Sequence, residues 1–164
     1  MISDLSAANR HDFYLRQAIA LAADAVERDL GGPFGCVIDR GGAVIGQGQN
    51  LVTSANDPTA HAEVMAIRQA CAALAQFHLS GCTLYTSCEP CPMCLGAIYW
   101  AHLDRVFFAA SRHDAANAGF VDEHLYVEIA KPITDREIPM TRHLPQEGME
   151  PFELWNRKAD RIEY

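Results

Sequence analysis

TLYTSCEPCPMCLGAIYWA, residues 83–101, reads as a β-strand that leads into a helix. Its β-branched and aromatic start is typical of a strand, and the apolar run from Cys91 onward predicts a helix. Pro90 suits a helix entrance, where the N–H that proline lacks would have no partner. Cys91 and Cys94 stand three residues apart and therefore share one helix face. The stretch predicts two thiols at the start of a helix, where the dipole favours thiolate.

Upstream, His61-Ala62-Glu63 follows the helix-start signal Asp57-Pro58-Thr59. Structural zinc sites are usually closed by four protein ligands, whereas catalytic sites use three and leave the last position to water. His61, Cys91 and Cys94 make three, so we predict a catalytic zinc site at which two helix N-termini converge. Glu63 is the predicted general acid/base, which takes a proton from water and delivers it to a substrate nitrogen.

Two other interpretations of the cysteines stay open at this point. Cys88, Cys91 and Cys94 form a Cys-x-x-Cys-x-x-Cys run, which resembles part of an iron–sulfur motif but lacks its closing Cys-Pro. Alternatively, Cys88 and Cys91 could supply the two zinc thiolates. We favour Cys91 and Cys94, because Cys88 precedes Pro90 and is expected on the loop.

Outward from these motifs, helical and extended patterns alternate, which predicts a layered α/β domain. The expected helices cover residues 11–29, 59–77, 91–101, 115–118, 124–129 and 151–160. The expected strands cover residues 34–39, 43–49, 83–86, 106–110 and 138–144.

Composition limits the class of protein. With 164 residues, nearly half of them apolar, the chain is expected to form one domain, residues 1–164. The net charge of −8 argues against a nucleic-acid partner, since such binders usually present a basic face. We recognise neither a signal peptide nor a membrane-length apolar run, so a cytoplasmic location and no membrane partner are expected. Cys36, Cys71 and Cys82 are expected in or near the core.

Several segments together are similar to one known family. They are Gly32-Pro33-Phe34-Gly35, Gly48-Gln49-Asn50, residues 56–63, residues 84–101, Gly119-Phe120 with Asp122, and the terminal Glu163-Tyr164. On these the chain resembles the cytidine deaminase-like superfamily, whose zinc nucleobase deaminases carry the same His-x-Glu and Pro-Cys-x-x-Cys signature. The Tyr99-Trp100 pair, the Gly-Phe-x-Asp segment and the tyrosine ending resemble its bacterial guanine deaminase branch.

The resemblance implies a three-layer α/β/α fold with a five-stranded mixed sheet, and zinc-dependent hydrolysis of guanine to xanthine and ammonia. It also implies a homodimer, in which the C-terminal segment, about residues 145–164, crosses to the other subunit; the sequence does not separate a swapped from an ordinary dimer. Glu63 and Asp122 would be catalytic. The implied substrate-binding residues are Asn50, Phe34, Ala62, Trp100, Asp122 and Tyr164.

Three alternatives share some of these residues. A tRNA adenosine deaminase would use the same metal motif, although the acidic net charge speaks against it. A deaminase of a related aminopurine or aminotriazine would differ only in the base that it accepts. A zinc or iron–sulfur module without catalysis would need a fourth protein ligand.

Overall fold

The computed structural model describes residues 7–164. The chain divides into two compact units, the first ending at Glu123 and the second spanning His124–Tyr164. The first unit holds the sheet and the predicted metal ligands. Each unit is described by itself.

The sheet of the first unit has four strands in the order β2-β1-β3-β4. The strands are β1 (Gly35–Arg40), β2 (Ala43–Gln49), β3 (Thr83–Cys88) and β4 (Arg105–Ala110). β1 pairs antiparallel with β2 and β3, and β3 pairs parallel with β4, so the sheet is mixed. The helices of this unit are α1 (Ala7–Glu27), α2 (Val52–Ala55), α3 (Ala62–Leu74), α4 (Pro92–Trp100) and α5 (Arg112–Asn117).

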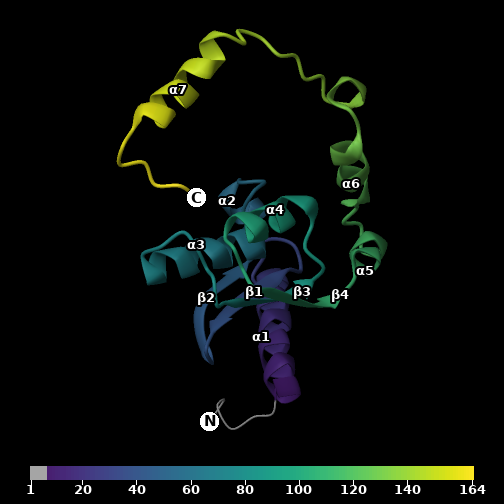
Figure 1. Cartoon of the computed structure of the whole chain (residues 1–164). Helices are drawn as coiled ribbons and strands as arrows, with labels where there is room; N and C mark the ends of the chain where they lie inside the picture. Colours follow the sequence, from purple (N-terminus) through teal and green to yellow (C-terminus); the bar gives the residue numbers. More distant parts are fainter. Residues whose placement is uncertain (1–6) are drawn as a thin grey trace. The chain divides into compact units, whose positions relative to one another are not determined.

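Helices cover both faces of this sheet (Figure 1), which gives the expected three layers. Strand residues alternate between the faces. One face, represented by Cys36, Ile38 and Leu84, packs against the alanines of α3 and against Ile98 of α4. The other face, represented by Val37 and Tyr85, packs against α1. The two cores therefore leave the carboxyl end of β3 beside the starts of α3 and α4.

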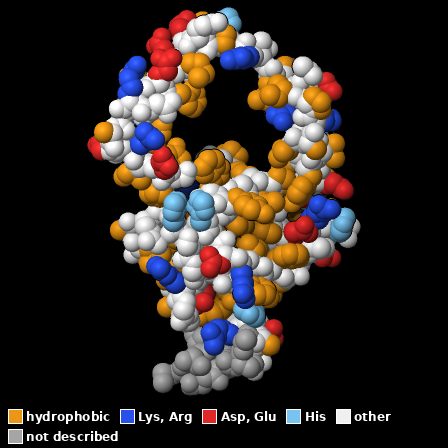
Figure 2. All heavy atoms as spheres, viewed as in Figure 1, with side chains coloured by type: hydrophobic (Ala, Val, Ile, Leu, Met, Phe, Trp, Pro, Cys, Tyr) orange, Lys and Arg blue, Asp and Glu red, His pale blue; other side chains and the backbone are white. Residues whose placement is uncertain are grey.

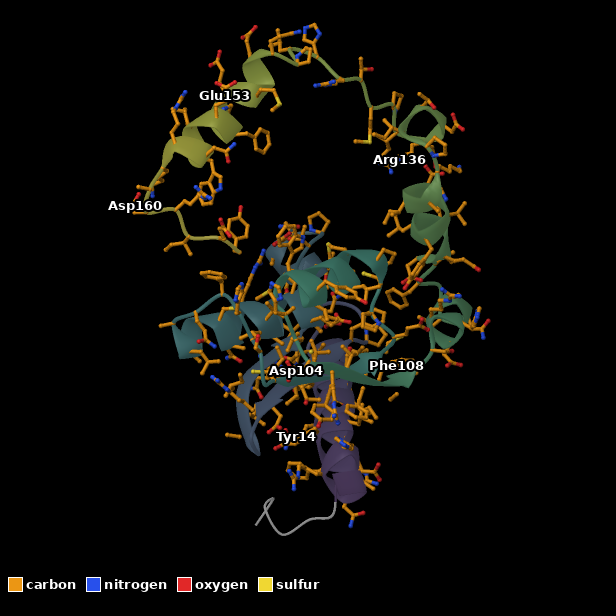
Figure 3. All side chains as sticks on the ribbon, in the orientation of Figure 1. Tyr14, Asp104, Phe108, Arg136, Glu153 and Asp160 are labelled. Atoms are coloured by element: carbon orange, nitrogen blue, oxygen red, sulfur yellow. The ribbon has the colours of Figure 1, made fainter. Side chains whose placement is uncertain are left out.

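A buried polar pair holds α1 to the sheet at its far end. Tyr14, labelled on α1 in Figure 3, is fully buried, and its hydroxyl donates to Asp39 Oδ1 over 2.7 Å. Asp39 also accepts from the Gly42 N–H in the turn between β1 and β2. Burial, and then the hydrogen bond to Asp39, raise the pKa of Tyr14, so the hydroxyl stays protonated as a donor.

Most expected elements are present, with ends shifted by a few residues. The prediction of a five-stranded sheet is wrong, because residues 138–144 form no strand. Ile138, Met140 and Leu144 would share one strand face, but Arg142 interrupts this pattern and Pro139 lacks an N–H for a strand ladder. Leu144 has φ 51°, a left-handed conformation that ends an extended run. The short helix α2 was not predicted.

The second unit consists of short helices joined by irregular segments. They are α6 (Glu123–Ala130), the 3₁₀ turns Ile133–Asp135 and Glu147–Met149, and α7 (Glu150–Arg157). No residue of 124–164 is buried, and apolar side chains are visible along α6 and α7 (Figure 2). Phe152 and Trp155 lie one helical turn apart on α7 and are 62% and 38% exposed. Among the described residues, no helix is long and apolar enough to cross a membrane.

Candidate metal and substrate site

The loop before α3 sets the position of His61. Asp57 Oδ1 accepts hydrogen bonds from the N–H and the hydroxyl of Thr59, which forms a tight turn. The backbone N–H of His61 then donates to the Thr59 carbonyl over 2.8 Å. His61 is the N-cap residue of α3, with φ −73° and ψ 153°, and the helix begins at Ala62. The imidazole therefore lies at the helix N-terminus, as the sequence predicted, although the helix starts three residues later than expected.

The loop before α4 sets the positions of Cys91 and Cys94. Cys91 is the N-cap residue of α4, with φ −66° and ψ 167°, and Pro92 occupies a first-turn position. Cys94 lies in the first turn and is fully buried. The helix thus starts one residue later than predicted, and Pro92 rather than Pro90 is the proline inside the helix entrance.

The structure brings the three predicted ligands together. His61 Nδ1 lies 3.6 Å from Cys91 Sγ and 3.5 Å from Cys94 Sγ. The three donor atoms lie within 4.8 Å of one another. Zinc bound tetrahedrally at about 2.3 Å from sulfur and about 2.0–2.1 Å from nitrogen would separate these atoms by about 3.5–3.6 Å. The two distances therefore fit two ligand pairs of one tetrahedral zinc.

The count of donors matches a catalytic metal. Within the described residues 7–164, this group contains three His, Cys, Asp or Glu donors and no fourth. Cys88 lies outside the group, and its thiol donates to the Ser111 carbonyl over 3.5 Å. Neither the pairing of Cys88 with Cys91 as zinc ligands nor an iron–sulfur site built on Cys88 fits this arrangement.

Charge at the two thiols supports metal binding. The Cys94 thiol and the His61 imidazole lower the pKa of Cys91 to about 4, although burial opposes them. The same contact with Cys91, together with burial, raises the pKa of Cys94. Cys91 is thus the thiol that ionises more readily, and a bound divalent cation would favour the thiolate form of both cysteines.

Glu63 lies in the first turn of α3 and is only 5% exposed. Burial raises the pKa of its carboxyl group, and contact with the Cys94 thiol partly opposes this. Thr86 on β3 donates a hydrogen bond to Glu63 Oε1 over 3.2 Å. A buried carboxyl with a raised pKa beside a metal site has the properties of a group that accepts and returns a proton.

The Asn50 side chain joins the loop before β1 to the segment that follows β2. It is 5% exposed, and its Oδ1 accepts hydrogen bonds from the N–H groups of Gly32 and Val52 at 3.1 and 3.2 Å. Because the amide oxygen is used in this way, the amide NH₂ remains as the group that could donate to a ligand. Gly31 permits this close approach, since a Cβ there would lie 2.4 Å from Asn50 Oδ1.

Asp122 lies near the predicted ligands, and Phe34 contacts the segment that contains Asp122. The charges of His61 and Cys91 act on Asp122, whose pKa is raised by burial and then by Cys91. Phe34 packs edge-on against Phe120, with ring centroids 5.0 Å apart. These contacts join residues 119–122 to the loop before β1, which the sequence motifs alone did not show.

The structure connects the remaining predicted substrate-binding residues less closely to the predicted metal ligands. Ala62 is fully buried, and its role in substrate binding stays a prediction. Trp100 follows Cys94 by six residues on α4, which puts it about 9 Å further along the axis and on another face; it is 66% exposed. Tyr164 lies in the second unit and is 74% exposed. The roles of Trp100 and Tyr164 stay predictions.

Two residues near Glu63 were missed from the sequence. The sequence motifs assign no role to Thr86, although a threonine at a core-facing strand position is a signal for a buried hydrogen bond. They assign none to Gly48 either. A Cβ there would lie 2.2 Å from the Ala62 carbonyl oxygen, so glycine lets β2 approach the start of α3.

Known proteins share both the sequence and this geometry. Guanine deaminase of Bacillus subtilis is 53% identical over 154 residues, which cover 94% of this chain and 99% of that protein. The X-ray structure of guanine deaminase from Bacillus subtilis superposes with a TM-score of 0.92 at 53% identity, covering 94% of this chain and 98% of the other. The tRNA-specific adenosine deaminase of Aquifex aeolicus is 38% identical over 99 residues, or 60% of this chain and 65% of that protein.

The match at the level of the family covers the described site almost completely. Residues 8–110 match the family described as the cytidine and deoxycytidylate deaminase zinc-binding region. That range contains all three donors of the metal group and also Glu63. It ends with β4 and leaves Asp122 outside. Since more than half of the chain matches, the protein belongs to the zinc-binding cytidine and deoxycytidylate deaminase family.

Proposed function

We propose that this protein hydrolyses guanine to xanthine and ammonia with zinc as its cofactor. The observation that carries the proposal is the placement of Glu63 beside the His61, Cys91 and Cys94 group. This arrangement occurs in a chain that is 53% identical to a guanine deaminase over almost its whole length.

The chain's own residues divide the chemistry between them. His61, Cys91 and Cys94 would hold the zinc, which lowers the pKa of a bound water from about 15.7 to about 7. Glu63 would accept a proton from the attacking water and return it to the exocyclic nitrogen at C2 of guanine. A C2–O bond forms, the C2–N bond breaks, and the amine leaves as ammonia. Asp122, close enough for the charges of His61 and Cys91 to act on it, would assist this proton transfer.

Recognition of the base would come from buried polar groups. The free amide N–H groups of Asn50 can donate to an acceptor on the purine, while its oxygen keeps the loop in place. The ring pair of Phe34 and Phe120 supplies an apolar wall beside Asp122. A site that pairs its polar groups with one base rejects an analogue that leaves them unpaired.

The direct test is an ammonia-release assay with the purified protein. Guanine, adenine, cytosine, guanosine, cytidine, an aminotriazine and tRNA are supplied separately, and zinc is measured on the same sample. We expect ammonia and xanthine from guanine, with about one zinc per chain. Inosine formation in tRNA without xanthine from guanine would instead favour the tRNA deaminase, and ammonia from an aminotriazine alone would favour the related-amine alternative.

Replacing Asn50 by aspartate is expected to raise the KM for guanine by about 10- to 100-fold. The aspartate can still accept from the N–H groups of Gly32 and Val52, so the loop should keep its shape. The donating NH₂ group is lost, and a negative charge takes its place. Steady-state kinetics with guanine measure the change, and Asn50→Ala, which also removes the oxygen, is the comparison. An unchanged KM in both variants would remove Asn50 from the base-binding site.

We further propose a cytoplasmic homodimer in which residues from the second unit act on the other subunit. No residue of 124–164 is buried, although Phe152, Leu154 and Trp155 of α7 are apolar. Forty-one residues that bury no side chain are not expected to fold without a partner. The exposed apolar side chains of α7 support a second copy of the chain as the partner that covers them.

Removal of Tyr164 is expected to lower activity on guanine without unfolding the protein, because the side chain would cover a site.

An exchange of this C-terminal segment between subunits has a sharper test. A Glu63→Gln chain with its tail and a tail-truncated chain with Glu63 are each made alone and then co-expressed. If the tail acts across the dimer, mixing restores activity at about a quarter of the sites. If the tail acts on its own subunit, the mixture stays as inactive as its parts.

A further inference from the structure

Thr86 is a polar residue in the middle of the sheet's most enclosed strand. β3 pairs with β1 on one side and β4 on the other, and Thr86 lies opposite Cys36 and Phe108 in those ladders. It is fully buried. By strand alternation it points to the same face as Leu84, the face that packs against α3 and α4.

The surroundings of Thr86 would suit valine, which has almost the same shape. Leu84, Cys36 and Ala66 make this face of the sheet an apolar core. A buried hydroxyl that lacks a partner is unfavourable, so a threonine here indicates a hydrogen bond that the fold uses. The structure shows that bond: the hydroxyl donates to Glu63 Oε1 over 3.2 Å.

The direction of the Glu63 carboxylate depends on the groups that surround it. Its carboxylate lies between the Thr86 hydroxyl and the Cys94 thiol, and the charges of Cys91 and His61 also act on it. Cys36, paired with Thr86 across the strands, is close enough for the charge of Glu63 to act on it. The helix fixes the backbone of Glu63, but the direction of the carboxylate depends on what it contacts at its tip.

We propose that Thr86 is a positioning residue, whose hydroxyl holds Glu63 Oε1 so that the other carboxylate oxygen carries the proton during deamination. The inference rests on the proposed function, because it gives Glu63 its acid/base role. It adds a residue on the sheet, outside the His-x-Glu and Cys-x-x-Cys motifs, to the groups that decide the rate. A proton carrier that is displaced by about 1 Å can lose about 100-fold in rate.

Thr86→Val removes the hydroxyl and keeps the shape, and Thr86→Ser keeps the hydroxyl and removes a methyl group. With guanine, we expect Thr86→Val to lower kcat by about 10- to 100-fold with little change in KM. Thr86→Ser should recover most of that loss. Both variants should keep the wild-type zinc content, because Thr86 contacts none of the three predicted ligands in the structure. Thr83→Val is the matched control, since Thr83 lies on the same strand and bonds to Tyr85 instead.

A second measurement does not depend on turnover. The urea midpoint is compared for Thr86→Val in the wild-type background and in a Glu63→Ala background. We expect the midpoint to fall in the first and to stay or rise in the second, because the hydroxyl has a partner only when Glu63 is present.

The outcomes separate the inference from the proposed function. If the wild-type protein releases no xanthine, the proposed function is contradicted, while the urea comparison still tests the bond between Thr86 and Glu63. Wild-type kcat in Thr86→Val would overturn the positioning role. So would an equal fall of the urea midpoint in both backgrounds, or loss of zinc from Thr86→Val, since either would make the hydroxyl purely structural.

Discussion

Glu63→Gln is expected to lower kcat for guanine by about 10²- to 10⁴-fold, the range that general acid–base catalysis contributes. Glutamine has the same size and can still accept the hydrogen bond from Thr86. It cannot take a proton from water near neutral pH. The predicted zinc ligands His61, Cys91 and Cys94 are untouched, so the variant should bind zinc as the wild type does. Xanthine formation and zinc content, measured on the same preparation, check both statements.

Glu27→Gln is a suitable control for this change. Glu27 ends α1 and is exposed, so the same neutralisation there should leave kcat unchanged. A Glu63→Gln protein with normal kcat would refute the acid/base role. A variant that lost its zinc would show instead that the carboxylate supports the metal group.

The Gly48→Ala substitution is expected to weaken both folding and zinc binding. A Cβ at Gly48 would lie 2.2 Å from the Ala62 carbonyl oxygen and 2.7 Å from the Ala66 nitrogen. Both atoms are backbone, so neither can rotate away, and β2 and α3 must separate. The expected fall in the free energy of unfolding is about 3 kcal/mol or more. Because the start of α3 carries His61 and Glu63, its displacement should also lower zinc affinity.

Gln47→Ala tests whether an alanine on β2 is itself harmful. Gln47 is the neighbouring residue and its side chain is exposed, so the variant should unfold close to the wild type. Urea unfolding and competition for zinc with a chromophoric chelator measure the two effects. If Gly48→Ala unfolded at the wild-type midpoint, the close approach of β2 to α3 would not control the site.

Much of the metal group was predictable because its information is local. Pro90 and the spacing of Cys91 and Cys94 predicted a helix start with two thiols on one face, although Pro92 is the proline inside the helix. Asp57 and Thr59 specify the turn that precedes His61. Each of these signals lies within a few residues of the group that it positions, and short-range geometry is enough to interpret it.

The failed prediction of a fifth strand shows the opposite case. Ile138, Met140 and Leu144 would lie on one face of a strand, but this pattern indicates only that one face could be covered. In the structure Ile138 is 77% exposed and the second unit contains no strand. A strand forms when a neighbouring strand supplies its hydrogen-bond partners. The residues around Ile138 carry no information about such a neighbour.

By itself, the sequence determined the kind of chemistry: imidazole, two thiols and a carboxylate, placed at helix starts by proline, aspartate and spacing. It also determined the alternation of strands and helices, since hydrophobic periodicity follows from the geometry of each element. Only the tertiary structure decided that Cys91 and Cys94 rather than Cys88 meet His61, that Thr86 bonds to Glu63, and that Gly48 lets the start of α3 come close. These contacts join residues more than ten positions apart, and their geometry depends on how the layers pack, which no local pattern encodes.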